Sequence, residues 1–230
     1  MDNIIVATIK EWNIKNYYSL IAKYSNQFNF HLITSSEDLS FERIKSIAPK
    51  YIFFPHWSWI IPEKIYKNYE CIVFHMTDLP FGRGGSPLQN LIMEGIYDTK
   101  VSAIKVQEGL DTGDIYMKED FSIALGSAEE IFIRLSDLVF QKMIPKLLEN
   151  KMVPIKQEGQ ETIFKRRTPS QSHLKQLNEV SLVKLYDFIR MLDGEGYPKA
   201  FLELDGLKIE FSEAHLKNNK LVGKFEVTEK

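Results

Sequence analysis

Apolar residues in this chain occur alternately as short β-branched or aromatic runs and at helical spacing. The runs predict strands over Ile4 to Ile9, Phe30 to Thr34, Tyr51 to Phe54, Cys71 to Phe74, Val101 to Val106 and Ile115 to Ile123. Helical spacing predicts helices over Asn13 to Tyr24 and over Leu39 to Ile47, between the first three strands. Because strands alternate with helices, the pattern indicates an α/β fold, with a parallel sheet flanked by helices as in a Rossmann-like core.

A long helix is predicted from Ala128 to Glu149, opened by a capping box of Ser127 and Glu130. The pattern changes from about residue 152, where a basic turn precedes a helix near Val180 to Leu192. Strand-like runs then flank Asp205 and Gly206, as in a β-hairpin. We therefore expect a catalytic domain over residues 1–151 and a small α+β subdomain over residues 152–230.

Composition excludes several classes of protein. The chain has 29 Lys and Arg against 31 Asp and Glu, for a net charge of -2, which argues against a nucleic-acid partner and against an anionic membrane surface. Its single cysteine, Cys71, rules out an internal disulfide, and the five histidines show no metal-ligand spacing, so no metal is expected. No signal peptide or membrane span is evident, and we expect a soluble, cytoplasmic protein.

His75 is the strongest candidate for chemistry. It ends the apolar run from Cys71 to Phe74 and precedes a loop rich in proline and glycine, and open α/β sheets bind ligands at such strand ends. A second loop, with Asp111, follows the run from Val101 to Val106. If adjacent parallel strands deliver both loops to one sheet edge, His75 and Asp111 form an acid/base pair in which the carboxylate orients the imidazole.

Two motifs resemble those of the folate-dependent formyltransferases. The family pattern Asn-x-His-x-Ser-Leu-Leu-Pro-x-x-Arg-Gly-x-x-Pro is matched at His75, Leu79, Pro80, Arg83, Gly84 and Pro87. The later Leu-Asp-x-Gly is matched at Leu110, Asp111 and Gly113. Val73 stands where the family has its asparagine, and Thr77 where it has its serine. Valine cannot hydrogen-bond a formyl oxygen, so a water, another group or the substrate must replace that amide, or activity is reduced.

The resemblance implies N10-formyltetrahydrofolate as cosubstrate, with His75 and Asp111 as catalytic residues. The loops that line the pterin pocket in the family correspond to Trp57, Ser58, Trp59 and Ile60, and to Gln107, Gly109 and Leu110. Acceptor contacts are expected from Lys10, Trp12, Asn13, Thr77, Arg83, Gly84 and Gly85. Lys10, Trp12 and Asn13 join a strand to a helix, a place suited to phosphate because free backbone N–H groups point outward there.

Further similarity, including Arg166-Arg167-Thr168-Pro169, points to the nucleotide-sugar branch of the family. The expected acceptor is the amine of a UDP- or dTDP-linked 4-amino-4,6-dideoxyhexose, a reaction of surface polysaccharide biosynthesis, with no nucleic-acid or membrane partner. The alternatives are a formyltetrahydrofolate hydrolase, a methionyl-tRNA formyltransferase-like enzyme, and a non-catalytic folate or sugar-nucleotide binding protein. The sequence leaves the oligomeric state open, a homodimer being one option.

Overall fold

The computed structural model describes residues 1–230, which form two compact units. The first unit comprises residues 1–83, 100–121 and 133–162, and the second comprises residues 84–99, 122–132 and 163–230. Both units are therefore assembled from segments that are distant in the sequence. The expected division into residues 1–151 and 152–230 stays a prediction.

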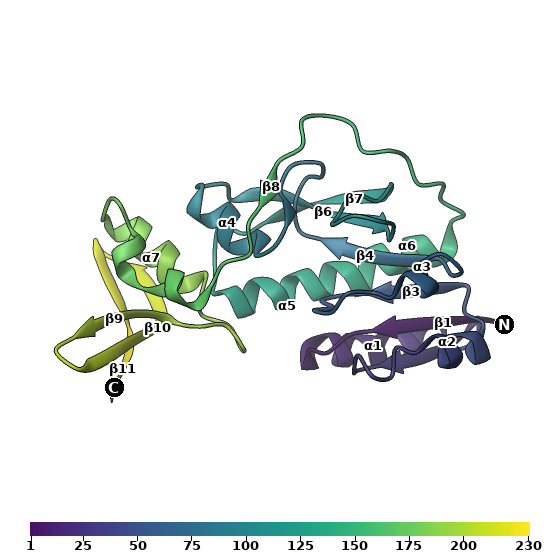
Figure 1. Ribbon diagram of the computed structural model, residues 1–230, viewed down its shortest axis with the longest axis horizontal. Helices are drawn as coiled ribbons and strands as arrows, with labels where there is room; N and C mark the ends of the chain where they lie inside the picture. The colour runs from purple at the N-terminus through teal and green to yellow at the C-terminus, as the bar shows by residue number, and fades with distance from the viewer. The chain divides into compact units, whose positions relative to one another are not determined.

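The first unit is built on a six-stranded sheet with the order β2-β1-β3-β4-β6-β7 (Figure 1). Its strands are β1 (Asp2–Ala7), β2 (Phe28–Ile33), β3 (Tyr51–Phe54), β4 (Cys71–His75), β6 (Asp98–Lys105) and β7 (Ile115–Ser122). The pairings of β1 with β2, β1 with β3 and β3 with β4 are parallel, as predicted. β6 pairs with β4 in the antiparallel sense, with His75 opposite Ser102. The premise that the His75 and Asp111 strands are parallel neighbours is therefore wrong.

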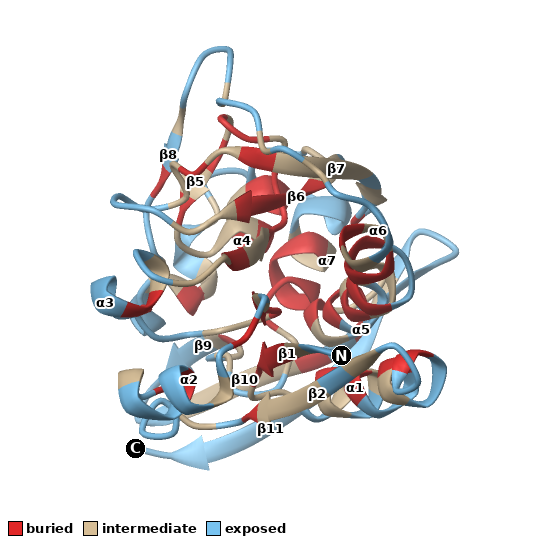
Figure 2. Ribbon diagram, turned by 90° about the vertical axis from the view of Figure 1, so that its right-hand side faces the viewer, coloured by how far each residue is buried: buried red, intermediate tan, exposed pale blue.

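Alternate residues of the strands face opposite sides of this sheet, and each side has its own apolar core. Ile4 and Val6 pack on one side with α1 (Glu11–Tyr24) and α6 (Ile144–Glu149). Ile5 and Ala7 pack on the other side with α2 (Phe41–Ile47) and α3 (Glu63–Tyr66). Figure 2 shows β1 as buried, as expected for a strand covered on both faces.

The predicted long helix is present, but its turns are not uniform. It begins as α5 (Ala128–Leu138), widens into a π-helical segment at Val139–Met143 and ends as α6. Pro145 lies just after the wide turn and has no N–H to donate, which accounts for the irregular hydrogen bonding at this point. The Ser127 and Glu130 capping box forms as predicted. None of the helices has the length and hydropathy needed to cross a bilayer.

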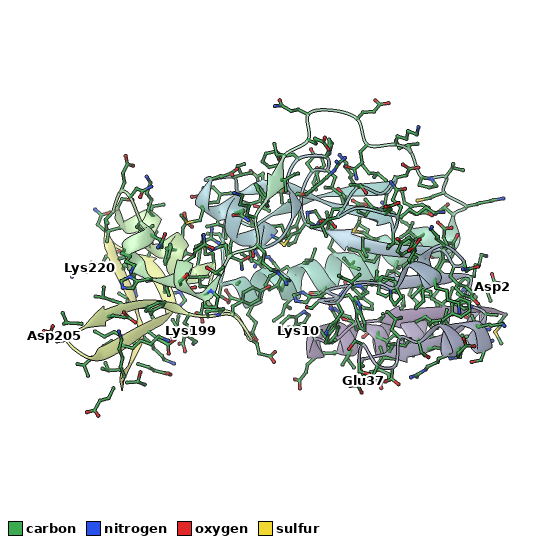
Figure 3. The ribbon with its side chains drawn as sticks, in the orientation of Figure 1. Asp2, Lys10, Glu37, Lys199, Asp205 and Lys220 are labelled. Carbon is green, nitrogen blue, oxygen red and sulfur yellow. The ribbon has the colours of Figure 1, made fainter.

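The second unit contains α4 (Pro87–Met93), α7 (Leu182–Arg190) and a three-stranded antiparallel sheet. The strands are β9 (Ala200–Leu204), β10 (Leu207–Lys217) and β11 (Lys220–Glu229), and Figure 3 shows Asp205 at the tip of the predicted β9–β10 hairpin. Two further strands, β5 (Arg83–Gly84) and β8 (Ile163–Phe164), pair with each other. Short 3₁₀ turns occupy Pro169–Ser172 and Leu174–Gln176.

A buried arginine organises the interior of the second unit. Arg190, on α7, is 1% exposed, and its Nε donates to Asp187 Oδ1 at 2.7 Å. Its NH1 nitrogen donates to the carbonyl oxygens of Ile123 and Gly126, while Tyr97 donates to the other oxygen of Asp187. A charge this deep is tolerated because it is paired and hydrogen-bonded.

Candidate active site

His75 is the last residue of β4 and is buried, with 8% of its surface exposed. Its Nε2 lies 2.8 Å from Gly82 O, and its Nδ1 lies 3.5 Å from Asp111 Oδ2. A carbonyl oxygen only accepts hydrogen bonds, so Nε2 carries the proton and donates it to Gly82. Both ring nitrogens therefore face acceptor oxygens, and one of these oxygens belongs to a carboxylate.

Asp111 reaches His75 from a loop that turns back over the sheet. Residues 106–114 join the antiparallel strand β6 to β7, and Lys105 N donates to Asp114 O where the loop closes. A Cβ on Gly113 would lie 1.6 Å from Lys105 O, so no other residue fits without displacing the loop. Asp111 itself has φ +54°, a left-handed conformation that aspartate tolerates better than most residues. The close approach of Gly113 to Lys105 O explains why the Leu-Asp-x-Gly motif ends in glycine.

The loop after β4 is held in place by hydrogen bonds with polar groups of β6 and β7. Thr77 is fully buried, its hydroxyl donates to Gly82 O, and its own carbonyl accepts from Ser102. Lys118 on β7 donates to Asp78 Oδ1 and Leu79 O, both at 2.5 Å. Thr77, expected to touch the acceptor, thus has bonds that fix the loop carrying Gly82.

Arg83 and the two following glycines are also engaged within the protein. Arg83 donates to Gln157 Oε1 through Nε and NH2, and its NH1 pairs with Glu161. In the second unit, a Cβ on Gly84 would lie 2.4 Å from Phe164 O, and one on Gly85 would lie 2.6 Å from Arg166 Cβ. Close packing against residues 164–166 is therefore a structural reason for both glycines.

Segment 157–162 is the part of this site that sequence reasoning missed. Thr162 Oγ1 accepts from Gly82 N, Thr162 N donates to Pro80 O, and Arg83 N donates to Thr162 O. Gln157 Nε2 donates to Asp111 O and Gly113 O, each at 2.8 Å. A polar segment without a regular pattern carries no sequence signal for such contacts, because they depend on how the chain returns to the sheet.

The predicted pterin-binding residues form exposed loops of the first unit. Trp57 packs against Phe54 and Trp59, with ring centroids 5.9 Å and 4.9 Å apart, and its indole N–H is buried with no hydrogen-bond partner. Exposed apolar groups follow at Trp59 (44%) and Ile60 (94%), and Leu110 on the second loop is 67% exposed. Ser58, Gln107 and Gly109 are exposed as well. An unpaired buried donor beside exposed apolar side chains is the chemistry that a flat heteroaromatic ring requires.

Lys10 lies at the far end of β1 from Asp2, as Figure 3 shows. Its Nζ lies 5.3 Å from the centre of the Trp12 ring, and Trp12 meets the His56 ring edge-on at 6.1 Å. Burial, with Lys10 nearby, lowers the pKa of His56 to about 4, so its ring is neutral at physiological pH. Asn13 is buried, and its amide donates to Thr8 Oγ1 and Pro55 O, which gives it a structural role.

Val73 has apolar neighbours from two clusters of the core. It packs against the cluster of Leu79, Ile104 and Ile115, and also against the core around Cys71. No group of three or more His, Cys, Asp or Glu residues is arranged to hold a metal ion. The candidate chemistry therefore rests on the His75 and Asp111 pair and on the polar groups that hold its loops.

Comparison with known proteins identifies two family matches that together span most of the chain. Residues 20–146 match the family described as formyl transferase, and residues 169–228 match the C-terminal domain of methionyl-tRNA formyltransferase. A solved structure of a methionyl-tRNA formyltransferase from Clostridium thermocellum is 53% identical, with full coverage of both chains and a TM-score of 0.96.

Curated relatives have the same name. The methionyl-tRNA formyltransferase of Rickettsia felis is 35% identical over 130 residues, covering 55% of this chain and 43% of the relative. That of Syntrophomonas wolfei is 28% identical over 178 residues, covering 74% of this chain and 56% of the relative. The chain thus spans about half the length of the curated relatives it matches.

These comparisons overturn the expected nucleotide-sugar branch. A sugar N-formyltransferase from Shewanella is 14% identical with a TM-score of 0.71. A Mycobacterium tuberculosis protein described as a likely sugar N-formyltransferase is 15% identical with a TM-score of 0.69, and both share only the fold. The assignments to a nucleotide-linked amino sugar and to surface polysaccharide biosynthesis are therefore wrong, as is the exclusion of a nucleic-acid partner. The prediction from net charge failed because net charge averages over the whole surface and does not report local contacts. The fold, the His75 and Asp111 motifs and the two matched regions agree, and the chain belongs to the formyl transferase family.

Proposed function

We propose that this protein transfers a formyl group from N10-formyltetrahydrofolate to the amine of methionyl-tRNA. The observation that carries the proposal is the full-length similarity to the Clostridium thermocellum methionyl-tRNA formyltransferase, at 53% identity. The placement of His75 Nδ1 at 3.5 Å from the Asp111 carboxylate supplies the acid/base pair that formyl transfer needs. We also propose that the reaction takes place in the cytoplasm.

The residues of the first unit support a direct transfer. The acceptor amine attacks the formyl carbon, the new C–N bond forms, and the bond from that carbon to the folate N10 breaks. His75 exchanges its Nε2 bond with Gly82 O for one with the formyl oxygen and stabilises the negative charge that develops there. Asp111 keeps the ring oriented and, through a water, accepts the proton lost by the amine. The Asp111 carboxyl group then returns this proton through the water to N10 as the bond from the formyl carbon to N10 breaks.

The predicted cosubstrate site fits a reduced folate in two respects. The buried indole N–H of Trp57 lacks a protein partner, and the neighbouring Trp59 and Ile60 offer exposed apolar surface to a ring. When bound, the folate supplies an activated formyl group on N10. A HypX from Aquifex aeolicus was solved in complex with tetrahydrofolic acid, and at 16% identity and a TM-score of 0.73 it shares the fold of this chain.

The test is a formylation assay with purified protein, N10-formyltetrahydrofolate and methionyl-tRNA. Formyl-methionyl-tRNA should form, and uncharged tRNA or tRNA charged with N-acetylmethionine should give none because neither presents the amine. Formyltetrahydrofolate consumed at the same rate without any acceptor would instead show a hydrolase. Binding of folate without turnover of any kind would show a non-catalytic binding protein, and either result would refute the proposal.

A further inference from the structure

We propose that Gln157 is a positioning residue that fixes the geometry of the His75 and Asp111 pair by hydrogen-bonding both the loop that follows His75 and the loop that contains Asp111. We call these contacts the clasp. The inference rests on the proposed function for its link to catalysis, while its structural part stands on contacts within the first unit. Gln157 lies outside both sequence motifs, in the segment that follows α6. It touches neither His75 nor the Asp111 carboxylate, and it acts through the backbone.

Both the NH2 group and the oxygen of the Gln157 side-chain amide form hydrogen bonds. Its Nε2 donates to Asp111 O and to Gly113 O, each at 2.8 Å. Its Oε1 accepts from Arg83 Nε at 3.1 Å and from Arg83 NH2 at 2.9 Å. Two donors and two acceptor sites are the full capacity of a primary amide, so one side chain satisfies four hydrogen bonds. Asparagine alone carries the same amide, and its side chain is one methylene group shorter.

These bonds join the loop that carries Gly82 to the loop that carries Asp111. Arg83 directly follows Gly82, whose carbonyl oxygen accepts from His75 Nε2 at 2.8 Å. On the other loop, Gln157 holds the carbonyl of Asp111 itself, a residue at φ +54°. The two oxygens that face the His75 ring belong to Gly82 and Asp111. Gln157 is hydrogen-bonded to Arg83, the residue after Gly82, and to Asp111 itself.

The side-chain hydrogen bonds of Gln107 and Thr112 in the loop of Asp111 are local. Thr112 Oγ1 donates to Glu108 O, and Gln107 Nε2 donates to Thr112 O, so both bonds stay inside the loop. A left-handed conformation at a residue other than glycine persists only where the surroundings impose it. Gln157 supplies that restraint, and a displacement of about 1 Å at a catalytic group can cost about a hundredfold in rate.

The informative variant is Gln157→Glu, which replaces the donor NH2 by an oxygen and keeps an acceptor for Arg83. Its new oxygen faces the carbonyl oxygens of Asp111 and Gly113 and repels them, while the size of the side chain is unchanged. Gln157→Ala removes both the donor NH2 group and the acceptor oxygen. Gln160→Ala is the matched control, since Gln160 is an exposed amide of the same segment. Asp111→Ala provides the reference state without a carboxylate.

The first readout does not depend on activity. The ring ¹⁵N resonances of His75 should move in both Gln157 variants toward those of Asp111→Ala, and amide hydrogen exchange over residues 106–114 should rise. Gln160→Ala should match the wild type, and urea unfolding should show that all variants fold. Unchanged His75 resonances and unchanged exchange in Gln157→Glu would overturn the clasp, whatever the protein's substrate proves to be.

The second readout is the formylation rate. Gln157→Glu should lower kcat at least about tenfold and change KM for either substrate by a smaller factor, because the variant displaces the Asp111 carboxylate and replaces none of the residues expected to contact a substrate. In the Asp111→Ala background, adding Gln157→Glu should cost little more, since its effect passes through Asp111. If the losses in kcat from Gln157→Glu and Asp111→Ala were additive in the double variant, the positioning role would be refuted. A normal kcat in Gln157→Glu despite shifted His75 resonances would refute it as well. A wild type that formylates no methionyl-tRNA would refute the proposed function and leave the resonance and exchange results to decide the clasp.

Discussion

His75 Nδ1 and Asp111 Oδ2 lie 3.5 Å apart although the strands that precede them, β4 and β6, run in opposite directions. The loop after β6 has to return over the sheet to achieve this. Gly113 permits that return by passing against Lys105 O, where any Cβ would clash. The pair is thus a product of loop geometry and of the groups that anchor the loop.

The pair should behave as one unit in catalysis. His75→Ala or Asp111→Ala should each lower turnover of methionyl-tRNA by at least about a hundredfold, the usual scale of acid/base assistance. The double variant should lose little beyond the worse single variant, because each group needs the other. Single-turnover rates measure both effects. Fully additive losses, or near-normal rates in either single variant, would separate the two residues.

Val73→Asn restores the residue type that the family motif has at this position, and it should gain at most a modest amount of activity. Val73 packs against Leu79, Ile104 and Ile115, so an amide here meets apolar groups. We expect a loss of about 1–2 kcal/mol in the free energy of unfolding, measured by urea titration, from the desolvated amide. A large rise in turnover would show instead that Val73 disables the wild-type site.

Stability should fall between neutral and mildly acidic pH because of His56. Its pKa is lowered from 6.5 to about 4 by burial and by Lys10 nearby, so between these values the unfolded chain binds a proton that the folded chain does not. Stability therefore drops as pH falls through this window, by on the order of 2 kcal/mol, and levels off below it. Urea unfolding at a series of pH values measures the drop.

His56→Asn is the control for this pH dependence. His56 has φ +54°, and asparagine tolerates that conformation while carrying no titrating group. The variant should lose the part of the pH dependence between pH 6.5 and 4 that His56 contributes. An identical pH profile in the variant and the wild type would assign the effect to other groups.

Asp187→Ala should strongly destabilise the second unit. It leaves the Arg190 guanidinium, 1% exposed, without its carboxylate partner, and removes the acceptor of the Tyr97 hydroxyl. Removing one partner of a buried pair typically costs about 3–5 kcal/mol. Lys50→Ala, which breaks the solvent-exposed pair with Asp2, should cost far less. Equal losses in the two variants would contradict the role assigned to Arg190.

The alternation of apolar runs and helical spacing was enough to predict the parallel part of the sheet, the long helix and the β9–β10 hairpin. Such patterns report which residues are buried, and burial is set locally by side-chain periodicity. The motifs around His75 and Asp111 likewise identified the family, because they require particular residue types at fixed spacing. They did not identify the acceptor, which depends on surface contacts that no short motif carries.

Tertiary structure alone decided the direction of β6, the route of the Asp111 loop and the part played by Gln157. Strand direction depends on how residues 76–97 cross between β4 and β6, and the apolar pattern of a strand reads the same in either direction. Gln157 is 46 residues from Asp111 in the sequence and meets it only when the chain returns from α6. A hydrogen bond between such distant residues is fixed by the packing of whole elements, which local periodicity does not encode.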